Sequence, residues 1–200
     1  MAMRMPAAER REQLLAVALD AFATHGFHQT SMNDVAEAAG ITKPVLYQHF
    51  DSKRELYVAV IEEAGRRMIE AIAYQALADI DERERTRLGF SAFFRWVADD
   101  HDAFRVLFAG GSRRDPEFNE IVRSFTAQIA DLIEPLITAD IDADHRRTLA
   151  YAIVGMTEGV SRRLIESGDD FDPDAIARQV SDLAWAGLRA AQRSTPASLN

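Results

Sequence analysis

The sequence contains no cysteine. Disulfide bonds, thiolate metal sites and cysteine nucleophiles are therefore excluded, and we expect a reducing, cytoplasmic location. Long apolar runs are also missing, and Met5-Pro6 leads directly into charged residues, so we expect neither a signal peptide nor a membrane-spanning helix. Only ten glycines and six prolines occur among 200 residues, of which 48% are hydrophobic and 28% charged. This composition is typical of a globular chain and excludes a fibrous or disordered one.

A strongly basic surface is missing as well. The formal net charge is −9, from 23 Lys and Arg against 32 Asp and Glu, which by itself argues against a nucleic-acid partner. The acidic excess is uneven, because residues 1–57 hold six basic and seven acidic side chains, whereas residues 58–200 hold 17 basic and 25 acidic ones. The N-terminal part is therefore repelled less by DNA.

Apolar residues recur with the 3.6-residue period of helices, and strand-like alternation is nearly absent, so we predict an all-α fold. The first helix is expected at residues 7–24, with Gly26 as its C-terminal stop. We divide the chain into a helix-turn-helix module at residues 1–57 and a larger helical body at residues 58–200. Helices of the body are predicted at residues 86–99, 103–108, 116–138, 144–166 and 174–193.

The segment after the first helix carries clear helix start and stop signals. Thr30 or Ser31 caps a second helix, which Gly40 ends where left-handed backbone is needed. Thr42 caps a short third helix, and a capping-box spacing at residues 52–55 opens a fourth. Two helices joined by a tight glycine turn and braced by another form a helix-turn-helix arrangement. These signals alone are compatible both with DNA binding and with plain helical packing.

Within the third helix, Leu46 and Phe50 face inward and leave the opposite side, near the helix start, for a major groove. The stretch from Phe27 to Leu56 resembles the DNA-binding signature of the tetracycline-repressor (TetR) family of bacterial transcription regulators. The matching residues are Thr30, Ala38-Ala39-Gly40, Thr42, Tyr47, His49-Phe50 and Lys53. The resemblance implies an N-terminal three-helix DNA-binding domain and a larger C-terminal domain that binds an effector and dimerises.

The resemblance also implies two kinds of DNA contact. Phosphate contacts are implied for Thr30, Thr42, Tyr47, His49 and Lys53, and positions at or near base edges for Lys43, Pro44 and Gln48. Hydroxyl, phenol and ammonium groups are suitable donors, and a lysine at a helix start adds its charge to backbone N–H groups. From the residues alone, Lys53 could instead be a cation at a solvated helix start and Tyr47 a half-exposed packing residue.

Pro44 departs from the family pattern, in which many members have glycine. Proline in the first helical turn costs no intrahelical hydrogen bond, so the helix is retained. An apolar contact with a thymine methyl group replaces the close backbone approach that glycine allows.

The last two predicted helices carry apolar faces that need partners. The candidate dimer interface consists of Ala152, Gly155, Gly159, Ile176, Val180, Leu183 and Gly187. Pairing across a two-fold axis would give a four-helix interface, and the alternative is that one subunit consumes both faces. TetR-like proteins pair through these helices, so the resemblance favours a homodimer.

Aromatic side chains are concentrated between residues 90 and 125. The candidates for an effector pocket are Phe90, Phe93, Phe94, Trp96, Phe104, Phe108, Phe118 and Phe125. Such enrichment indicates either a tight core or an apolar cavity. The resemblance favours a cavity for a small apolar or amphipathic effector.

Catalytic and metal-binding patterns are missing. There is no nucleophile elbow or dinucleotide fingerprint, and the histidines have no second ligand at metal-binding spacing. We therefore expect no enzyme, no cofactor and no metal, and no membrane partner. The prediction is a homodimeric transcriptional regulator, a repressor in preference to an activator, that binds a palindromic double-stranded DNA operator. The alternatives are a ligand-independent or activating regulator and a helical protein–protein adaptor.

Overall fold

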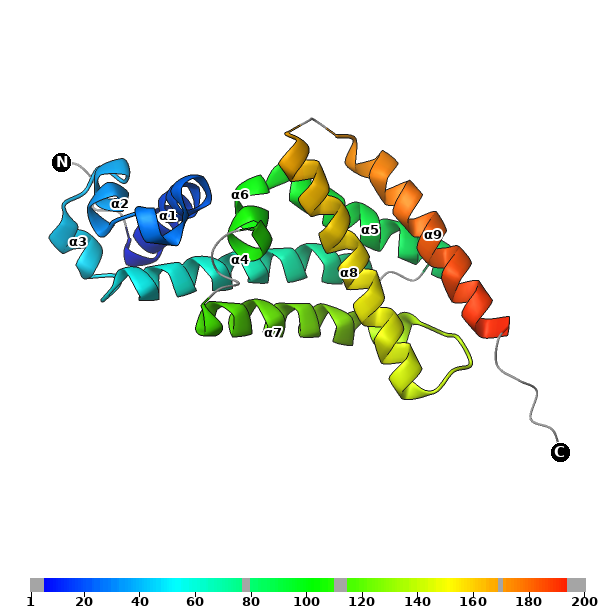
Figure 1. Ribbon diagram of the computed structural model, residues 1–200. Helices are drawn as coiled ribbons and strands as arrows, with labels where there is room; N and C mark the ends of the chain where they lie inside the picture. The colour runs from blue at the N-terminus through cyan, green and yellow to red at the C-terminus, as the bar shows by residue number, and fades with distance from the viewer. Residues whose placement is uncertain (1–5, 77–79, 110–114, 169–170, 194–200) are drawn as a thin grey trace. The chain divides into compact units, whose positions relative to one another are not determined.

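The computed structural model describes residues 6–76, 80–109, 115–168 and 171–193, which form helices and contain no strand (Figure 1). The predicted all-α fold is confirmed. The chain divides into two compact units. Unit 1 comprises Met1–Arg66 and His101–Val122, and unit 2 comprises Arg67–Asp100 and Arg123–Asn200. Residues 58–66 and 101–122 thus belong to the same compact unit as the predicted N-terminal module. The functional division after residue 57 stays a prediction.

Unit 1 is built around α1 (Ala7–Gln29). This helix packs against α2 (Met32–Ala38), α6 (His101–Phe104) and the π-helical segment η1 (Arg105–Ala109), while α2 packs against α3 (Lys43–Tyr47). The unit also contains the first part of α4 (Lys53–Ala76) and the start of α7 (Pro116–Ile133). Its fully buried side chains include Leu14, Val35, Leu46, Phe50, Leu56, Tyr57 and Phe118.

Most of the predicted stop and cap signals of unit 1 are present in the structure, although Thr42 at the N-cap of α3 makes no side-chain capping hydrogen bond. Gly26 and Gly40 adopt left-handed backbone, with φ of +76° and +66°, and Gly26 breaks α1 three residues before it ends. Ser31, one of two candidate caps, forms a capping box with Asp34 at the start of α2. The Ser31 backbone N–H, donating to this carboxylate, lowers the pKa of Asp34. The cap therefore stabilises the fold at neutral pH and is lost as the pH falls through that lowered pKa.

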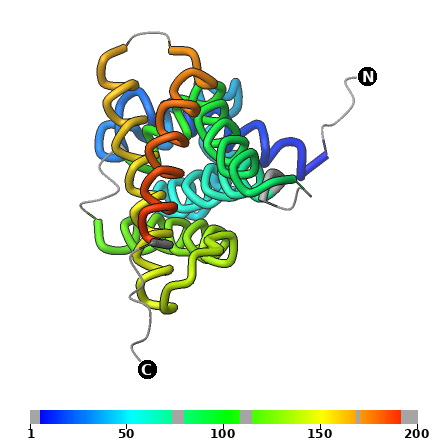
Figure 2. Tube along the Cα trace, turned by 90° about the vertical axis from the view of Figure 1, so that its right-hand side faces the viewer, coloured from blue at the N-terminus to red at the C-terminus, as the bar shows by residue number. Residues whose placement is uncertain are grey.

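Unit 2 is organised around α5 (Glu82–Asp99) and α9 (Pro173–Arg193), which pack along each other (Figure 2). The two helices are antiparallel, because Arg83 pairs with Asp182 while Ser91, further along α5, hydrogen-bonds to Asp174 at the start of α9. The other elements of the unit include α8 (Ala143–Ser167) and the 3-10 turn η3 (Glu134–Leu136).

Several helix boundaries differ from the predicted ones, among them the end of α1 at Gln29 and the start of α6 at His101, and at two others a local cause is visible. Helix α5 begins at Glu82 rather than residue 86, because Asp81 caps it by accepting a hydrogen bond from the Glu84 backbone. Helix α7 ends at Ile133 rather than residue 138, because Pro135 cannot continue the helical hydrogen bonding and the chain tightens into η3. In the part of the chain that the structure describes, no helix has the length and apolarity needed to cross a bilayer.

Candidate nucleic-acid interface

Helix α3 buries one side and exposes the other. Leu46 on α3 is fully buried, and Phe50 just after it is 1% exposed. The opposite side and the residues that flank the helix carry five exposed side chains for which DNA contacts are predicted, namely Thr42, Lys43, Pro44, Tyr47 and Gln48. The structure therefore brings together one small surface that offers a hydroxyl, an ammonium, a phenol and an amide.

Two details keep these groups available at the surface. The hydroxyl of Thr42 makes no capping hydrogen bond, although the residue occupies the N-cap of α3. The ammonium of Lys43 lies 5.9 Å from the centroid of the Tyr47 ring, and Tyr47 is 42% exposed. His49, the next predicted phosphate ligand, is half-buried just beyond the helix.

Thr30 lies inside the unit instead of on this surface. The residue is 1% exposed, and its hydroxyl lies 2.9 Å from the Gly26 carbonyl oxygen and 3.1 Å from that of Ala21. The side chain thus holds the chain together where Gly26 breaks α1. The phosphate contact predicted for this hydroxyl is not supported by its placement, because its donor is already used within the fold.

Lys53 at the start of α4 is also turned inward. Its ammonium nitrogen lies 2.8 Å from the carbonyl oxygen of Phe27, 3.0 Å from that of Thr30 and 3.4 Å from that of His28. The same nitrogen lies 4.5 Å from the centroid of the Phe27 ring. These carbonyls belong to the end of α1, where helical partners run out and a cation is favoured. Lys53 therefore caps α1, so its predicted phosphate contact would have to compete with three carbonyls.

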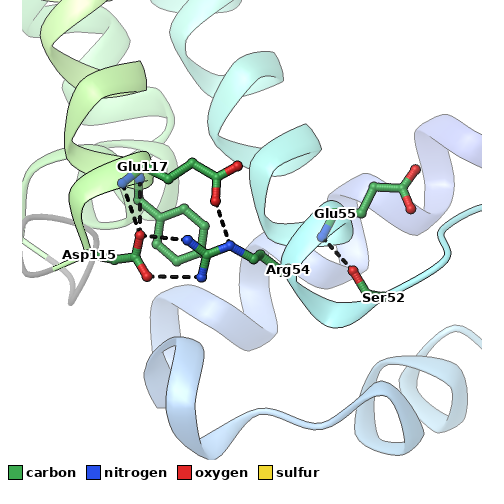
Figure 3. Close-up of polar contacts among 6 residues, drawn as sticks. Ser52, Arg54, Glu55, Asp115 and Glu117 are labelled. Carbon is green, nitrogen blue, oxygen red and sulfur yellow. Dashed lines mark hydrogen bonds and ion pairs between the residues drawn. The ribbon is translucent and has the colours of Figure 1, made fainter.

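Arg54 makes hydrogen bonds to two carboxylates at the start of α7 (Figure 3). Its two terminal nitrogens bind the two carboxylate oxygens of Asp115, at 2.7 and 2.9 Å, and its Nε donates to Glu117. The guanidinium also lies 4.5 Å from the centroid of the Phe118 ring. The paired guanidinium lowers the pKa of Asp115, and the two carboxylates raise the pKa of Arg54. The ion pairs therefore persist through neutral pH. We call Arg54, Asp115 and Glu117 the clamp.

Phe118 belongs to an aromatic cluster under the clamp. Its ring centroid lies 4.7 Å from that of Tyr57 and 5.1 Å from that of Phe27, while Phe22 contacts Tyr57 at 4.8 Å. The side chain of Phe118 is 1% exposed. This candidate for an effector pocket is therefore part of the core of unit 1.

The remaining aromatic candidates also divide between the units. Phe104 and Phe108 contact each other in unit 1, with centroids 5.0 Å apart. In unit 2, α5 carries the four buried residues Phe90, Phe93, Phe94 and Trp96, and α7 carries the half-buried Phe125. The eight residues thus divide between the two units, and which of them line an effector pocket stays a prediction.

Most of the dimer candidates lie at the surface of α8 and α9. Ala152, Gly155, Gly159, Leu183 and Gly187 are exposed, and Ile176 is half-buried. Val180 is 8% exposed, so little of its side chain is available to a partner. Leu183, at 65% exposure, and Tyr151, at 40%, are large hydrophobic side chains left on these helices.

Sequence reasoning missed the partners of Lys53 and the clamp. Gly26 gave an indirect signal for Lys53, because a break in α1 leaves carbonyls that need donors. No local pattern predicts the clamp, since Arg54 and Asp115 lie 61 positions apart in the sequence. Within the described residues, no cluster of three or more potential metal ligands occurs.

Comparisons with known proteins agree with this arrangement. The family model for bacterial regulatory proteins of the tetR family matches residues 14–60, and that for the tetracyclin repressor-like C-terminal domain matches residues 82–187. The HTH-type transcriptional activator FasR of Mycolicibacterium smegmatis is 32% identical over 187 residues, covering 92% of this chain and 85% of FasR. These matches describe regulators rather than enzymes, as the sequence predicted.

Solved structures show the same fold. A TetR-like transcriptional regulator from Rhodococcus sp. RHA1 superimposes with a TM-score of 0.80 at 33% identity, covering 93% of this chain and 99% of that one. FadR from Bacillus subtilis, solved in complex with stearoyl-CoA, gives a TM-score of 0.75 at 17% identity and covers 88% of this chain and 98% of that one. At that identity, FadR supports the fold alone.

Proposed function

The chain belongs to the TetR family of bacterial transcriptional regulators, and we propose that it binds a palindromic operator as a homodimer through α3. The exposed side of α3 carries this proposal, because it is the surface on which the donors gather. Lys43, Pro44 and Gln48 are the proposed base contacts, while Thr42, Tyr47 and His49 contact phosphates. A regulator that binds the chromosome works in the cytoplasm.

The proposed dimer is supported by an exposed face of α8 and α9. Small residues at Gly155, Gly159 and Gly187 allow another helix to approach closely, and Leu183 supplies an apolar side chain to bury. A two-fold axis relates the two α3 helices, so the operator half-sites lie about 34–36 Å, or a multiple of that distance, apart.

A binding selection tests the operator proposal. Purified protein is incubated with a random pool of duplexes, and the retained duplexes are sequenced and compared with shuffled duplexes of equal composition. We expect a motif with dyad symmetry. Retention of no duplex, or of duplexes without symmetry, contradicts the proposal and favours the helical adaptor.

Gln48→Ala is expected to relax the base preference of the selected motif. A well-placed amide pair contributes about 1–3 kcal/mol of discrimination against the wrong base. The variant is assayed against the selected duplex and its single-base variants, with Gln13→Ala on α1 as the matched control. Unchanged discrimination by Gln48→Ala would remove this residue from the base contacts.

The direction of control is the second part of the proposal. A dimer bound across a promoter blocks polymerase, and we propose this repressor action. FasR is named an activator, which keeps activation as the competing outcome. A reporter fused to the selected operator decides between them, because deletion of the regulator raises expression under repression and lowers it under activation.

We further propose an amphipathic effector with a long apolar part, of which an acyl thioester is an example. The stearoyl-CoA in FadR shows that a protein of this fold holds such a molecule. In unit 2, the indole N–H of Trp96 and the hydroxyl of Ser161 are buried with no hydrogen-bond partner among the described residues. Buried polar groups are ordinarily paired, so each of these two groups is a candidate partner for a polar group of a ligand.

Ser161→Ala tests this assignment. If the hydroxyl has no partner in the free protein, its removal leaves the unfolding midpoint unchanged or raises it, because an unpaired buried hydroxyl costs about 1–3 kcal/mol. The midpoint is measured by thermal unfolding with and without stearoyl-CoA. We expect the ligand-induced rise to shrink in the variant, with Ser124→Ala on the exposed side of α7 as the control. A lower midpoint without ligand would mean that Ser161 has an internal partner.

A further inference from the structure

The clamp joins the starts of two long helices. Arg54 lies in the first turn of α4, and its partners Asp115 and Glu117 lie at the start of α7. Both helices begin in unit 1 and continue into unit 2. The boundary between the units falls after Arg66 in α4 and after Val122 in α7. The clamp therefore joins the start of α4 to the start of α7 within unit 1.

Asp115 serves both helices at once. Its Oδ1 accepts hydrogen bonds from the backbone N–H groups of Glu117, at 3.1 Å, and Phe118, at 3.4 Å, and it also accepts from Arg54. The planar guanidinium engages both carboxylate oxygens, which fixes its direction as well as its distance. Isolated surface ion pairs contribute little, but a bidentate pair within a network is the recognised exception. The stacking of Arg54 on the buried ring of Phe118 holds it in the same orientation.

The start of α4 in turn controls the position of α3. Only five residues separate the end of α3 at Tyr47 from Lys53, and Lys53 ties this point to the end of α1. A change in the direction of the first turn of α4 therefore moves the proposed recognition helix. Small misplacements are costly in base contacts, because bidentate hydrogen bonds require correct distance and direction.

We propose that Arg54 is a positioning residue for operator recognition, held by Asp115 and Glu117 at the start of α7. Its role is to orient α4 and hence α3, without contacting DNA itself. The inference rests on the proposed operator binding. It assigns a specific task to side chains that lie outside the helix-turn-helix motif.

The rival explanation is that Arg54 is a phosphate ligand that the two carboxylates partly neutralise. The two explanations predict opposite signs for one variant. If Arg54 binds phosphate, Asp115→Asn frees it and raises DNA affinity. If Arg54 is a positioning residue, Asp115→Asn lowers operator affinity, as Arg54→Ala does.

The experiment measures affinity for the duplex selected by the wild-type protein and for a shuffled duplex, over a range of salt concentrations. We expect Arg54→Ala and Asp115→Asn each to lower affinity for the selected duplex about fivefold or more, the ordinary scale of coupling between sites. The double variant should be no worse than either single one, because both remove the same contact. Affinity for the shuffled duplex and the slope against log salt should stay close to wild type. The thermal midpoint should fall by too little to unfold the variants at the assay temperature.

Three controls make the result decisive. Glu62→Gln removes an acidic charge from α4 outside the clamp and reports the general effect of charge on DNA affinity. Arg54→Lys keeps the positive charge but lacks the planar guanidinium. Its affinity for the selected duplex should therefore be little higher than that of Arg54→Ala. The double variant that carries both Arg54→Asp and Asp115→Arg restores an ion pair with the charges exchanged. It should recover part of the lost affinity, and it replaces a single variant that folds poorly.

Several outcomes would overturn the inference. These are higher affinity in Asp115→Asn beyond that in Glu62→Gln, a salt slope lowered by about one in Arg54→Ala, and wild-type affinity in all clamp variants. A fall in thermal midpoint that accounts for the lost affinity would also overturn it, because the clamp would then be only a stabilising contact. If the wild-type protein itself selects no duplex, the proposed function has failed, which is distinct from failure of the clamp.

Discussion

Leu183→Arg is expected to convert the proposed dimer into a monomer and to abolish the proposed operator binding. Leu183 is 65% exposed on the face of α9 that also carries Gly187. In a two-fold interface each substitution occurs twice, and two arginines would meet near the axis without partners. A single DNA-binding unit contacts only one half-site. We therefore expect affinity for the selected duplex to fall about a thousandfold or more, towards that for non-specific DNA.

Light scattering gives the mass of the wild-type protein and the variant, and circular dichroism shows whether the helices are retained. Arg189→Glu is the matched control, because it changes a charge on the same helix about 120° around from Leu183, at 3.6 residues per turn. It should remain a dimer. A dimeric Leu183→Arg protein with wild-type DNA affinity would exclude this face of α9 as the interface.

The local signals of the sequence predicted most of unit 1. Gly26 and Gly40 were identified as stops because only left-handed backbone fits a helix end that turns so tightly, and both adopt positive φ. The apolar period placed Leu46 and Phe50 inside, which left the exposed side of α3 as the candidate DNA surface. Caps, stops and periodicity depend on neighbours within a few residues, so they can be identified from the sequence.

Side-chain roles that depend on distant partners could not be predicted. Thr30 and Lys53 match the family signature, yet in the structure both satisfy the end of α1. Phe118 was grouped with the aromatic residues of the body, but its neighbours Phe27 and Tyr57 lie more than 60 positions away in the N-terminal unit. Such contacts form only when the helices pack, and no spacing in the sequence encodes them.

The two lysines of the chain provide a matched pair for separating a structural cation from a DNA-binding one. Lys53→Met is expected to lower the free energy of unfolding by about 1–3 kcal/mol, since the carbonyls at the end of α1 lose a charged donor. For a chain of this size, that loss corresponds to a midpoint about 2–4 °C lower per kcal/mol. Binding to all DNA sequences should weaken together, because the end of α1 and the start of α4 lose their connection.

Lys43→Met is expected to weaken DNA binding without lowering the stability of the fold. Lys43 is exposed on α3, and its ammonium lies over the Tyr47 ring at 5.9 Å. Its loss should therefore change stability by no more than about 0.5 kcal/mol while lowering affinity for the selected duplex. Thermal unfolding and binding at several salt concentrations are measured for both variants. If Lys53→Met instead keeps its midpoint and lowers the salt slope by about one, the ammonium must leave the carbonyls of α1 and bind phosphate when DNA is present.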